Sequence, residues 1–250
     1  MKFSILLFSK LFFFAIGISC QNFNLSLGSS KITFESIQFK TDSILFVNLH
    51  HDEITSIKAI KAVLPKYYGK YVGLKNAGKR EVSLFEKGKP LKFDPNRIYT
   101  QVGIEKTLRN YGSYSELNAK LLQSFSLDLL NRFSKAELLI ALHNNSNGGF
   151  SVNSILKEKQ TKNDALQVFV NPVKDEDDFY YVTQKSEFDY FKSMGYNVVL
   201  QDNEKVEDDG SLSVWCGKND IDYINVECQS GHLEEQMQMI REVFNVLRME

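Results

Sequence analysis

The chain has 250 residues, of which 43% are hydrophobic and 24% are charged, and its formal net charge at pH 7 is -1. A chain of this length can bury a core of its own without disulfides or a structural metal. The near-neutral charge argues against a broad electrostatic attraction to nucleic acid or anionic lipid, so no nucleic-acid partner is expected.

The N-terminal segment has the pattern of an export signal. Lys2 is followed by an apolar run from Ile5 to Ile18, which Lys10 interrupts. A positive start and a short apolar stretch are typical of a secretory signal, and the run is too short for a comfortable membrane span. We therefore predict a signal peptide over residues 1–19.

The end of this segment resembles a bacterial lipoprotein cleavage site, because residues 17–20 read Gly-Ile-Ser-Cys. That resemblance implies a lipidated Cys20, a polar tether over residues 20–28 and a folded domain over residues 29–250. The protein would then be exported and held to the membrane of the bacterial cell envelope, in the periplasm or at the outer membrane, by its lipid alone. A plain signal peptide with an incidental Cys20 is the alternative. Whether Cys216 and Cys228 form a disulfide stays open.

The rest of the chain alternates between strand and helix patterns. The apolar run Ser43–His50 indicates a buried strand, and Asp52 is placed to cap the helix that follows it. We expect further strands at residues 80–85, 137–143, 166–170, 197–200 and 223–227, and helices at 53–64, 115–133, 187–194 and 233–247. This alternation predicts an α/β fold with a mixed, largely parallel sheet and helices on both faces.

Three chemically useful side chains lie at the carboxyl ends of predicted strands, where ligands gather in sheets of this kind. They are His50, His143 and Glu227. His50 and Glu53 are three residues apart at the junction of strand and helix, and His143 ends a separate strand. Two histidines and one carboxylate are a common ligand set for catalytic zinc, which leaves a fourth position for water. We predict that His50, Glu53 and His143 bind Zn²⁺, with His51 as a weaker competitor for His50.

The order of four short motifs resembles the zinc carboxypeptidase superfamily, and most closely its aspartoacylase and succinylglutamate desuccinylase-like amidohydrolases. The motifs are His50-His51-Asp52-Glu53, Asp94-Pro95-Asn96-Arg97, Ala141-Leu142-His143-Asn144 and Asn225-Val226-Glu227. Each motif alone is weak, whereas four in this order form a moderately specific signal. The resemblance covers the chain from about residue 43 to residue 227.

The resemblance also implies a role for each matching side chain. Asn96 and Arg97 would hold a substrate carboxylate, and Glu227 would act as the general base that activates water. The relatives place an arginine shortly before the second motif to stabilise the oxyanion. This chain has Lys89 and Lys92 there, so Lys89 is the expected substrate-binding cation and Arg80 is a more distant candidate. The implied substrate is a small peptide or an N-acyl amino acid, cleaved at its amide bond.

Two other functions remain open. The segment Ile140–Ser146 resembles a strand of the zinc N-acetylmuramoyl-L-alanine amidases, which cleave cell-wall material. Two features depart from that family: Glu53 lies too close to His50 for its pattern, and Asp94–Arg97 would have no role. A lipid-anchored binding protein that uses Arg97 to hold an anion is the alternative that is not an enzyme.

Overall fold

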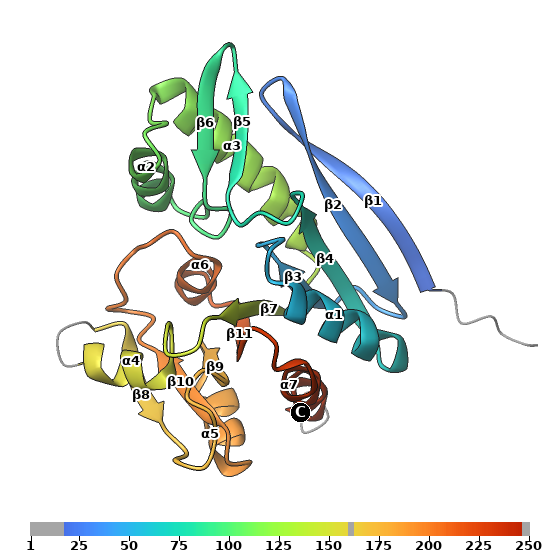
Figure 1. Cartoon of the computed structure of the whole chain (residues 1–250), viewed down its shortest axis with the longest axis vertical. Helices are drawn as coiled ribbons and strands as arrows, with labels where there is room; N and C mark the ends of the chain where they lie inside the picture. Colours follow the sequence, from blue (N-terminus) through green and yellow to red (C-terminus); the bar gives the residue numbers. More distant parts are fainter. Residues whose placement is uncertain (1–17, 160–162, 247–250) are drawn as a thin grey trace, which may run out of the picture.

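The computed structural model describes residues 18–159 and 163–246, and it is built on a nine-stranded mixed sheet. The strand order is β1-β2-β4-β3-β7-β11-β9-β10-β8, with the blue hairpin β1–β2 at one end and β8 at the other (Figure 1). The hairpin β5–β6 forms a separate two-stranded sheet. The strands are β1 (Ile18–Leu27), β2 (Ser30–Phe39), β3 (Ile44–Asn48), β4 (Gly69–Lys75), β5 (Val82–Glu86), β6 (Lys89–Phe93), β7 (Leu138–Asn145), β8 (Ala165–Phe169), β9 (Phe179–Val182), β10 (Asn197–Gln201) and β11 (Asp222–Gln229).

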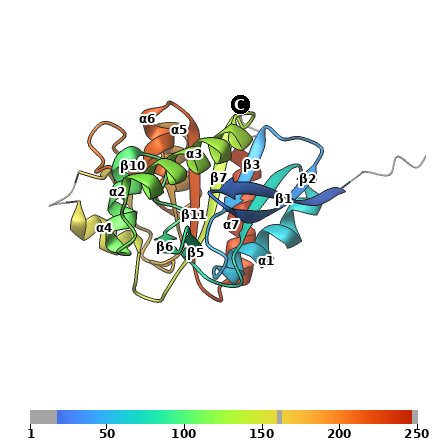
Figure 2. The same ribbon diagram turned by 90° about the horizontal axis from the view of Figure 1, so that it is seen from above.

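The helices cover both faces of the sheet. They are α1 (Ile54–Val63), α2 (Gln101–Asn110), α3 (Glu116–Phe133), α4 (Val152–Glu158), α5 (Lys185–Ser193), α6 (Leu212–Lys218) and α7 (Leu233–Val246), with a short 3-10 turn η1 (Leu64–Lys66). Helices α2, α3 and α6 contribute to one hydrophobic core, and α1, α5 and α7 to another. Helices α1 and α7 pack side by side (Figure 2). The expectation of an α/β fold with a mixed sheet and helices on both faces is confirmed.

The parallel strands at the centre of the sheet are buried between two layers of helices. Strands β4, β3, β7 and β11 are parallel neighbours, and all five residues of β3 are buried. A strand buried on both faces needs a continuous apolar run, which is what residues 44–47 provide. The carboxyl ends of β3, β7 and β11 therefore lie at the same edge of the sheet.

The segment over residues 20–28, predicted as a polar tether, is instead mostly strand. Strand β1 pairs with β2 in an antiparallel hairpin, so Cys20 lies within the sheet, at its exposed edge. The physical reason is the alternation in this strand: Leu25 and Leu27 are buried, whereas the polar residues between and before them face solvent. Residues 1–17 of the predicted signal peptide lie outside the described part of the chain, as does residue 247, where the last helix was expected to end.

Helix α1 begins one residue later than expected. Its N-cap is Glu53, which makes no side-chain capping hydrogen bond, and Asp52 does not cap it. The Glu53 carboxylate is used elsewhere, as described below. Cys216 and Cys228 are both free and buried in different cores, Cys216 on α6 and Cys228 on β11, so they form no disulfide. Within residues 18–159 and 163–246, no helix has the length and hydrophobicity needed to span a membrane.

Candidate active site

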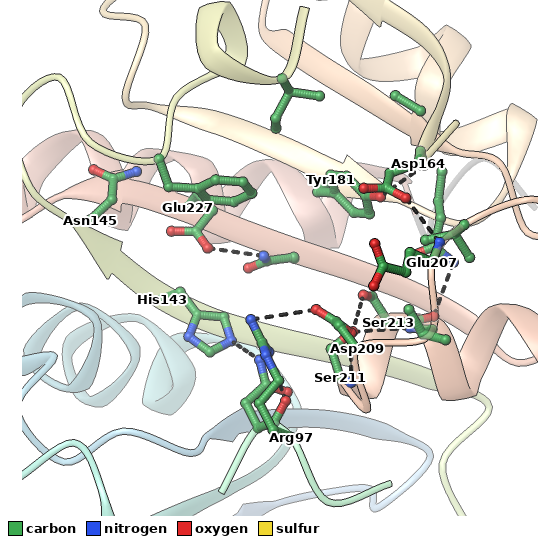
Figure 3. Close-up of a pocket in the computed structure, with 18 of the residues that line it drawn as sticks. Arg97, His143, Asn145, Asp164, Tyr181, Glu207, Asp209, Ser211, Ser213 and Glu227 are labelled. Atoms are coloured by element: carbon green, nitrogen blue, oxygen red, sulfur yellow. Dashed lines mark hydrogen bonds and ion pairs between the residues drawn. The ribbon is translucent and has the colours of Figure 1, made fainter. Parts of the chain in front are cut away.

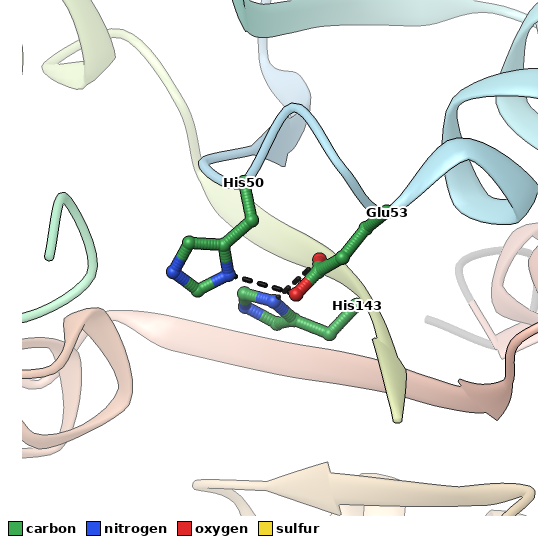
Figure 4. Close-up of side chains that lie close together, drawn as sticks. All are labelled: His50, Glu53 and His143. Carbon is green, nitrogen blue, oxygen red and sulfur yellow. Dashed lines mark hydrogen bonds and ion pairs between the residues drawn. The ribbon is translucent and has the colours of Figure 1, made fainter. Parts of the chain in front are cut away.

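Three predicted ligands meet at the carboxyl edge of the parallel strands. His50 follows β3, Glu53 lies at the start of α1, and His143 is in β7. Figure 4 shows both imidazole rings directed toward the Glu53 carboxylate. His50 Nδ1 is 2.8 Å from Glu53 Oε1, and His143 Nδ1 is 3.0 Å from Glu53 Oε2. All three residues are buried.

The turn between β3 and α1 brings His50 and Glu53 together. The backbone N–H of Glu53 donates to the carbonyl of His50 at 3.3 Å, which places the two side chains on the same side of the turn. His143 comes from 90 residues further along the chain, because β7 is the parallel neighbour of β3. The sheet thus provides the long-range contact, and the turn provides the local one.

Two further charged residues complete the cluster. Asp94 Oδ1 lies 2.8 Å from His50 Nε2 and also accepts the backbone N–H of Asn96 at 2.7 Å. Arg80 Nη1 donates to Glu53 Oε1 at 2.8 Å, and its Nε lies 3.8 Å from Asp94. Both nitrogens of His50 therefore face a carboxylate, and both carboxylates also pair with the Arg80 guanidinium.

Burial and charge pairing oppose each other in this cluster. Burial alone would lower the pKa of His50, but its contacts with Asp94 and Glu53 raise that pKa above the usual range. Burial favours the neutral form of Glu53, yet His143 and His50 lower its pKa, and His50 likewise lowers that of Asp94. The carboxylates are thus charged, and the imidazole of His50 holds a proton that a cation would replace.

The donor set fits a divalent metal ion. One ligand atom from each of His50, Glu53 and His143 lies within 4.8 Å of the other two. Two imidazoles and a carboxylate match the chemistry that Zn²⁺ selects. Asp94 behind His50 is the kind of carboxylate that orients a ligating histidine through its second nitrogen. These residues would hold the ion.

Glu227 lies beside this cluster on the next strand. It is the register partner of His143 across the parallel pair β11 and β7, and it is buried. Asn225 donates to Glu227 Oε1 at 3.1 Å and fixes the direction of the carboxylate. Burial raises the pKa of Glu227, although His143 partly offsets this effect. A carboxylate with a raised pKa is better suited to accept a proton near neutral pH.

A cavity of about 780 Å³ opens onto the cluster. Glu53, Arg80, His143 and Glu227 line one part of it, together with Asn96 and Arg97. Figure 3 shows His143 and Glu227 at one end, Asp164 and Glu207 at the other, and Arg97 along one wall. The volume is in the range of cavities that take small-molecule ligands.

Asn96 and Arg97 differ in how free their side chains are. Asn96 Oδ1 accepts the backbone N–H of Leu212 at 3.1 Å, and its Nδ2 lies 3.5 Å from His143 Nε2. Arg97 donates through Nη1 to the carbonyl of Asn96 and lies 3.5 Å from Asp209 through Nη2, with 36% of its side chain exposed. Arg97 is thus the better placed of the two to bind an anion in the cavity.

The structure places the predicted cation Lys89 and the alternative Arg80 differently relative to the cavity. Lys89 begins β6 and does not line the cavity, whereas Arg80 does and contacts Glu53. Arg80 precedes the hairpin β5–β6 and Asp94 follows it. The two ends of the hairpin lie close together, so Arg80 is near Asp94 although it is more distant from it in sequence than Lys89. The Nδ1 of His51, the expected weaker competitor for His50, accepts the backbone N–H of Asn76 at 2.5 Å instead.

Asp94 is the site residue to which sequence reasoning gave no role. It is the first residue of the segment Asp94–Arg97, from which only the last two side chains were assigned. The signal was present, since an acidic residue that the motif places near two histidines is a natural hydrogen-bond partner for one of them. Its pairing with His50 gives the whole segment a place at the site.

No protein-family model and no curated protein sequence matches the chain. Solved structures with a similar chain trace include a succinylglutamate desuccinylase/aspartoacylase-type protein from Shewanella frigidimarina, at 10% identity and a TM-score of 0.46, over 92% of this chain and 72% of that one. A protein of Shewanella denitrificans described as a metallopeptidase has 12% identity and a TM-score of 0.44, over 92% and 83%. Murein-tripeptide amidase MpaA from Escherichia coli O157 has 13% identity and a TM-score of 0.44, over 94% and 92%. Function is therefore inferred from the side-chain geometry of the site.

Proposed function

We propose that this protein is a zinc-dependent hydrolase that cleaves the amide or peptide bond of a small substrate bearing a carboxylate. The observation that carries the proposal is the convergence of His50, Glu53 and His143 beside Glu227, at the floor of a cavity that also exposes Arg97. Ligands, base and anion-binding group are then within reach of one bound molecule.

Each side chain has a separate task in this reaction. Zinc, when bound by His50, Glu53 and His143, supplies a Lewis acid that polarises the substrate carbonyl and a water molecule. Glu227 accepts the proton of the attacking water and delivers it to the departing amine. Arg80 adds positive charge beside the carbonyl oxygen as negative charge develops there.

Arg97 orients the substrate. Its guanidinium can form two parallel charge-assisted hydrogen bonds with a carboxylate. The group that Arg97 now contacts is Asp209, at 3.5 Å, and a substrate carboxylate would compete with that aspartate. An N-acyl amino acid or a short peptide has the required carboxylate close to its amide bond.

Metal analysis of the purified full chain, combined with single substitutions, tests the proposal. We expect zinc bound at the His50 cluster. The variant His143→Ala should lose that ion, and it should also lose the ability to release free amino acid from N-acyl amino acids. His51→Gln is the matched control, because His51 is a neighbouring histidine that binds a loop N–H instead. It should retain both the metal and the activity.

The same measurements separate the alternatives. A chain that binds zinc through these residues but cleaves only the muramyl amide would support the amidase alternative. A chain whose metal content does not change in His143→Ala would contradict the proposal, and anion binding that depends on Arg97 would then favour a simple binding protein.

We also propose export and lipid anchoring through Cys20. The signal pattern of residues 1–19 supports this, as does the exposure of Cys20 on the edge strand β1. Incorporation of labelled fatty acid into the full chain, lost in Cys20→Ala, tests it. Export without label would favour a plain signal peptide, and the absence of both would contradict the proposal.

A further inference from the structure

A second group of potential metal ligands lies outside the site described above. Asp178 directly precedes β9, Cys228 is in β11, and His232 lies in the turn before α7. One ligand atom from each lies within 4.8 Å of the other two. Within residues 18–159 and 163–246, this cluster and the His50 cluster are the two groups that meet this distance criterion.

The second cluster faces away from the candidate active site. Side chains alternate along a strand, so the neighbours Glu227 and Cys228 point to opposite faces of the sheet. Glu227 lines the large cavity, whereas Cys228 packs in the core shared with α1, α5 and α7. The second cluster and the candidate active site therefore lie on opposite faces of the sheet.

The hydrogen bonds of this cluster already orient two of its ligands. His232 Nδ1 is 2.9 Å from Asp178 Oδ2, and the other oxygen of Asp178 accepts the backbone N–H of Gln229 at 2.8 Å. A backbone donor of this kind fixes a ligating carboxylate. The Cys228 thiol donates to the carbonyl of His232 at 3.5 Å, a weak hydrogen bond that a metal–sulfur bond can replace at little cost.

A cation can reach two of the three ligands, Asp178 and His232, from solvent. Asp178 and His232 line a second cavity of about 620 Å³. Its other charged residues are Asp175, Glu234, Glu235 and Lys174, and the lysine is paired with Glu235 at 3.1 Å. The excess of negative charge favours the approach of a divalent cation.

We propose that Asp178, Cys228 and His232 form a second metal site, for a divalent transition metal ion of the zinc type. Imidazole, carboxylate and thiolate together suit Zn²⁺, whose ligand atoms lie about 3.3–3.6 Å apart in a tetrahedral site, so small movements of these side chains are enough. Binding breaks the thiol S–H bond, forms a metal–sulfur bond and releases the proton to solvent. The ion would join the starts of β9 and α7 to the end of β11.

Cobalt substitution of the full chain tests this site by its sulfur ligand. A Co²⁺ ion bound by thiolate has an intense near-ultraviolet charge-transfer band, and the His50 cluster contains no cysteine that could produce one. We expect two Co²⁺ ions per chain and a thiolate band. Cys228→Ala should lose the band and one ion, whereas Cys216→Ala, which removes the other buried thiol from a different core, should retain both.

Further variants make the result independent of the first site. His143→Ala should lose one ion but keep the band, so failure of the His50 site would not affect this test. Should Cys228→Ala fail to fold, Asp178→Asn and His232→Gln should each weaken the band with an unchanged far-ultraviolet circular dichroism spectrum. A cobalt-treated full chain without a thiolate band would overturn the proposal. The three side chains would then have only the role of linking β9, β11 and the turn before α7 by hydrogen bonds.

Discussion

Glu227 and His143 are register partners on the neighbouring parallel strands β11 and β7. This pairing places a candidate base directly beside a candidate metal ligand, and the backbone hydrogen bonds of the sheet hold both in position. The distance between them is thus set by strand pairing, which resists local fluctuation better than a loop would.

The substitution Glu227→Gln separates metal binding from catalysis. A glutamine amide keeps the size of the side chain but cannot accept the proton, so we expect unchanged zinc content and a fall in kcat of about 10²–10⁴-fold. Metal analysis and steady-state kinetics on the same preparation check this. Glu137→Gln, just before the start of β7 and far from its carboxyl end, is the control and should leave kcat unchanged. Undiminished turnover in the Glu227 variant would remove Glu227 from the mechanism.

Arg80 and Lys89 can be compared directly as the cation that stabilises the oxyanion. Arg80→Met removes the guanidinium beside Glu53, and we expect kcat to fall by about 10²–10³-fold, as for the loss of one oxyanion donor. Lys89→Met should have little effect, because Lys89 does not line the cavity. Zinc content must be measured in both variants, since Arg80 also contacts a predicted ligand. A larger loss in the Lys89 variant would restore the sequence-based assignment.

Part of the site could be predicted because the relevant strands are unambiguous. Residues 44–47 and 138–142 are continuous apolar runs, and a polar residue that follows such a run is expected near the edge of the sheet. The i, i+3 spacing of His50 and Glu53 is a local feature that the following turn preserves.

The remainder depends on contacts that no local pattern encodes. The polar residues of β1 are typical of a tether, and only pairing with β2 and the burial of Leu25 and Leu27 make them a strand. The position of Arg80 depends on how the hairpin β5–β6 returns the chain to Asp94. Sequence separation favoured Lys89, whereas the tertiary structure favours Arg80.

Arg97 should govern substrate affinity through the carboxylate. Arg97→Lys keeps the positive charge but loses the two-pronged geometry, so we expect KM to rise about tenfold, with a smaller change in kcat. A substrate whose carboxylate is replaced by an amide provides the matched comparison. The original protein and the variant should hydrolyse that amide with similar, poor efficiency; an equal loss on both substrates would show that Arg97 does not bind the carboxylate.

The close approach of Gly103 and Gly210 supports the segment that carries Asp94 and Arg97. A Cβ atom added to Gly103 would lie 2.2 Å from the Cα of Gly210 and 2.9 Å from the carbonyl oxygen of Arg97. These are backbone atoms, so relief requires helix α2 to separate from the loop that carries Gly210, and the hydrogen bond from Tyr99 N–H to the Gly210 carbonyl at 3.0 Å would weaken. We therefore expect Gly103→Ala to lower the free energy of unfolding by about 1–3 kcal/mol.

The same substitution should also impair the site, although Gly103 contacts none of the predicted ligands. Movement of Asp94 would remove the carboxylate that orients His50, and zinc affinity should fall about 10–100-fold, as when the carboxylate partner of a metal-ligating histidine is lost. Urea unfolding and zinc titration measure the two effects. Gly88→Asn is the control: Gly88 has a φ of 77° with open space around it, and asparagine tolerates that conformation. A Gly103 variant that is destabilised but binds zinc normally would show that the contact between α2 and Gly210 supports the fold and not the site.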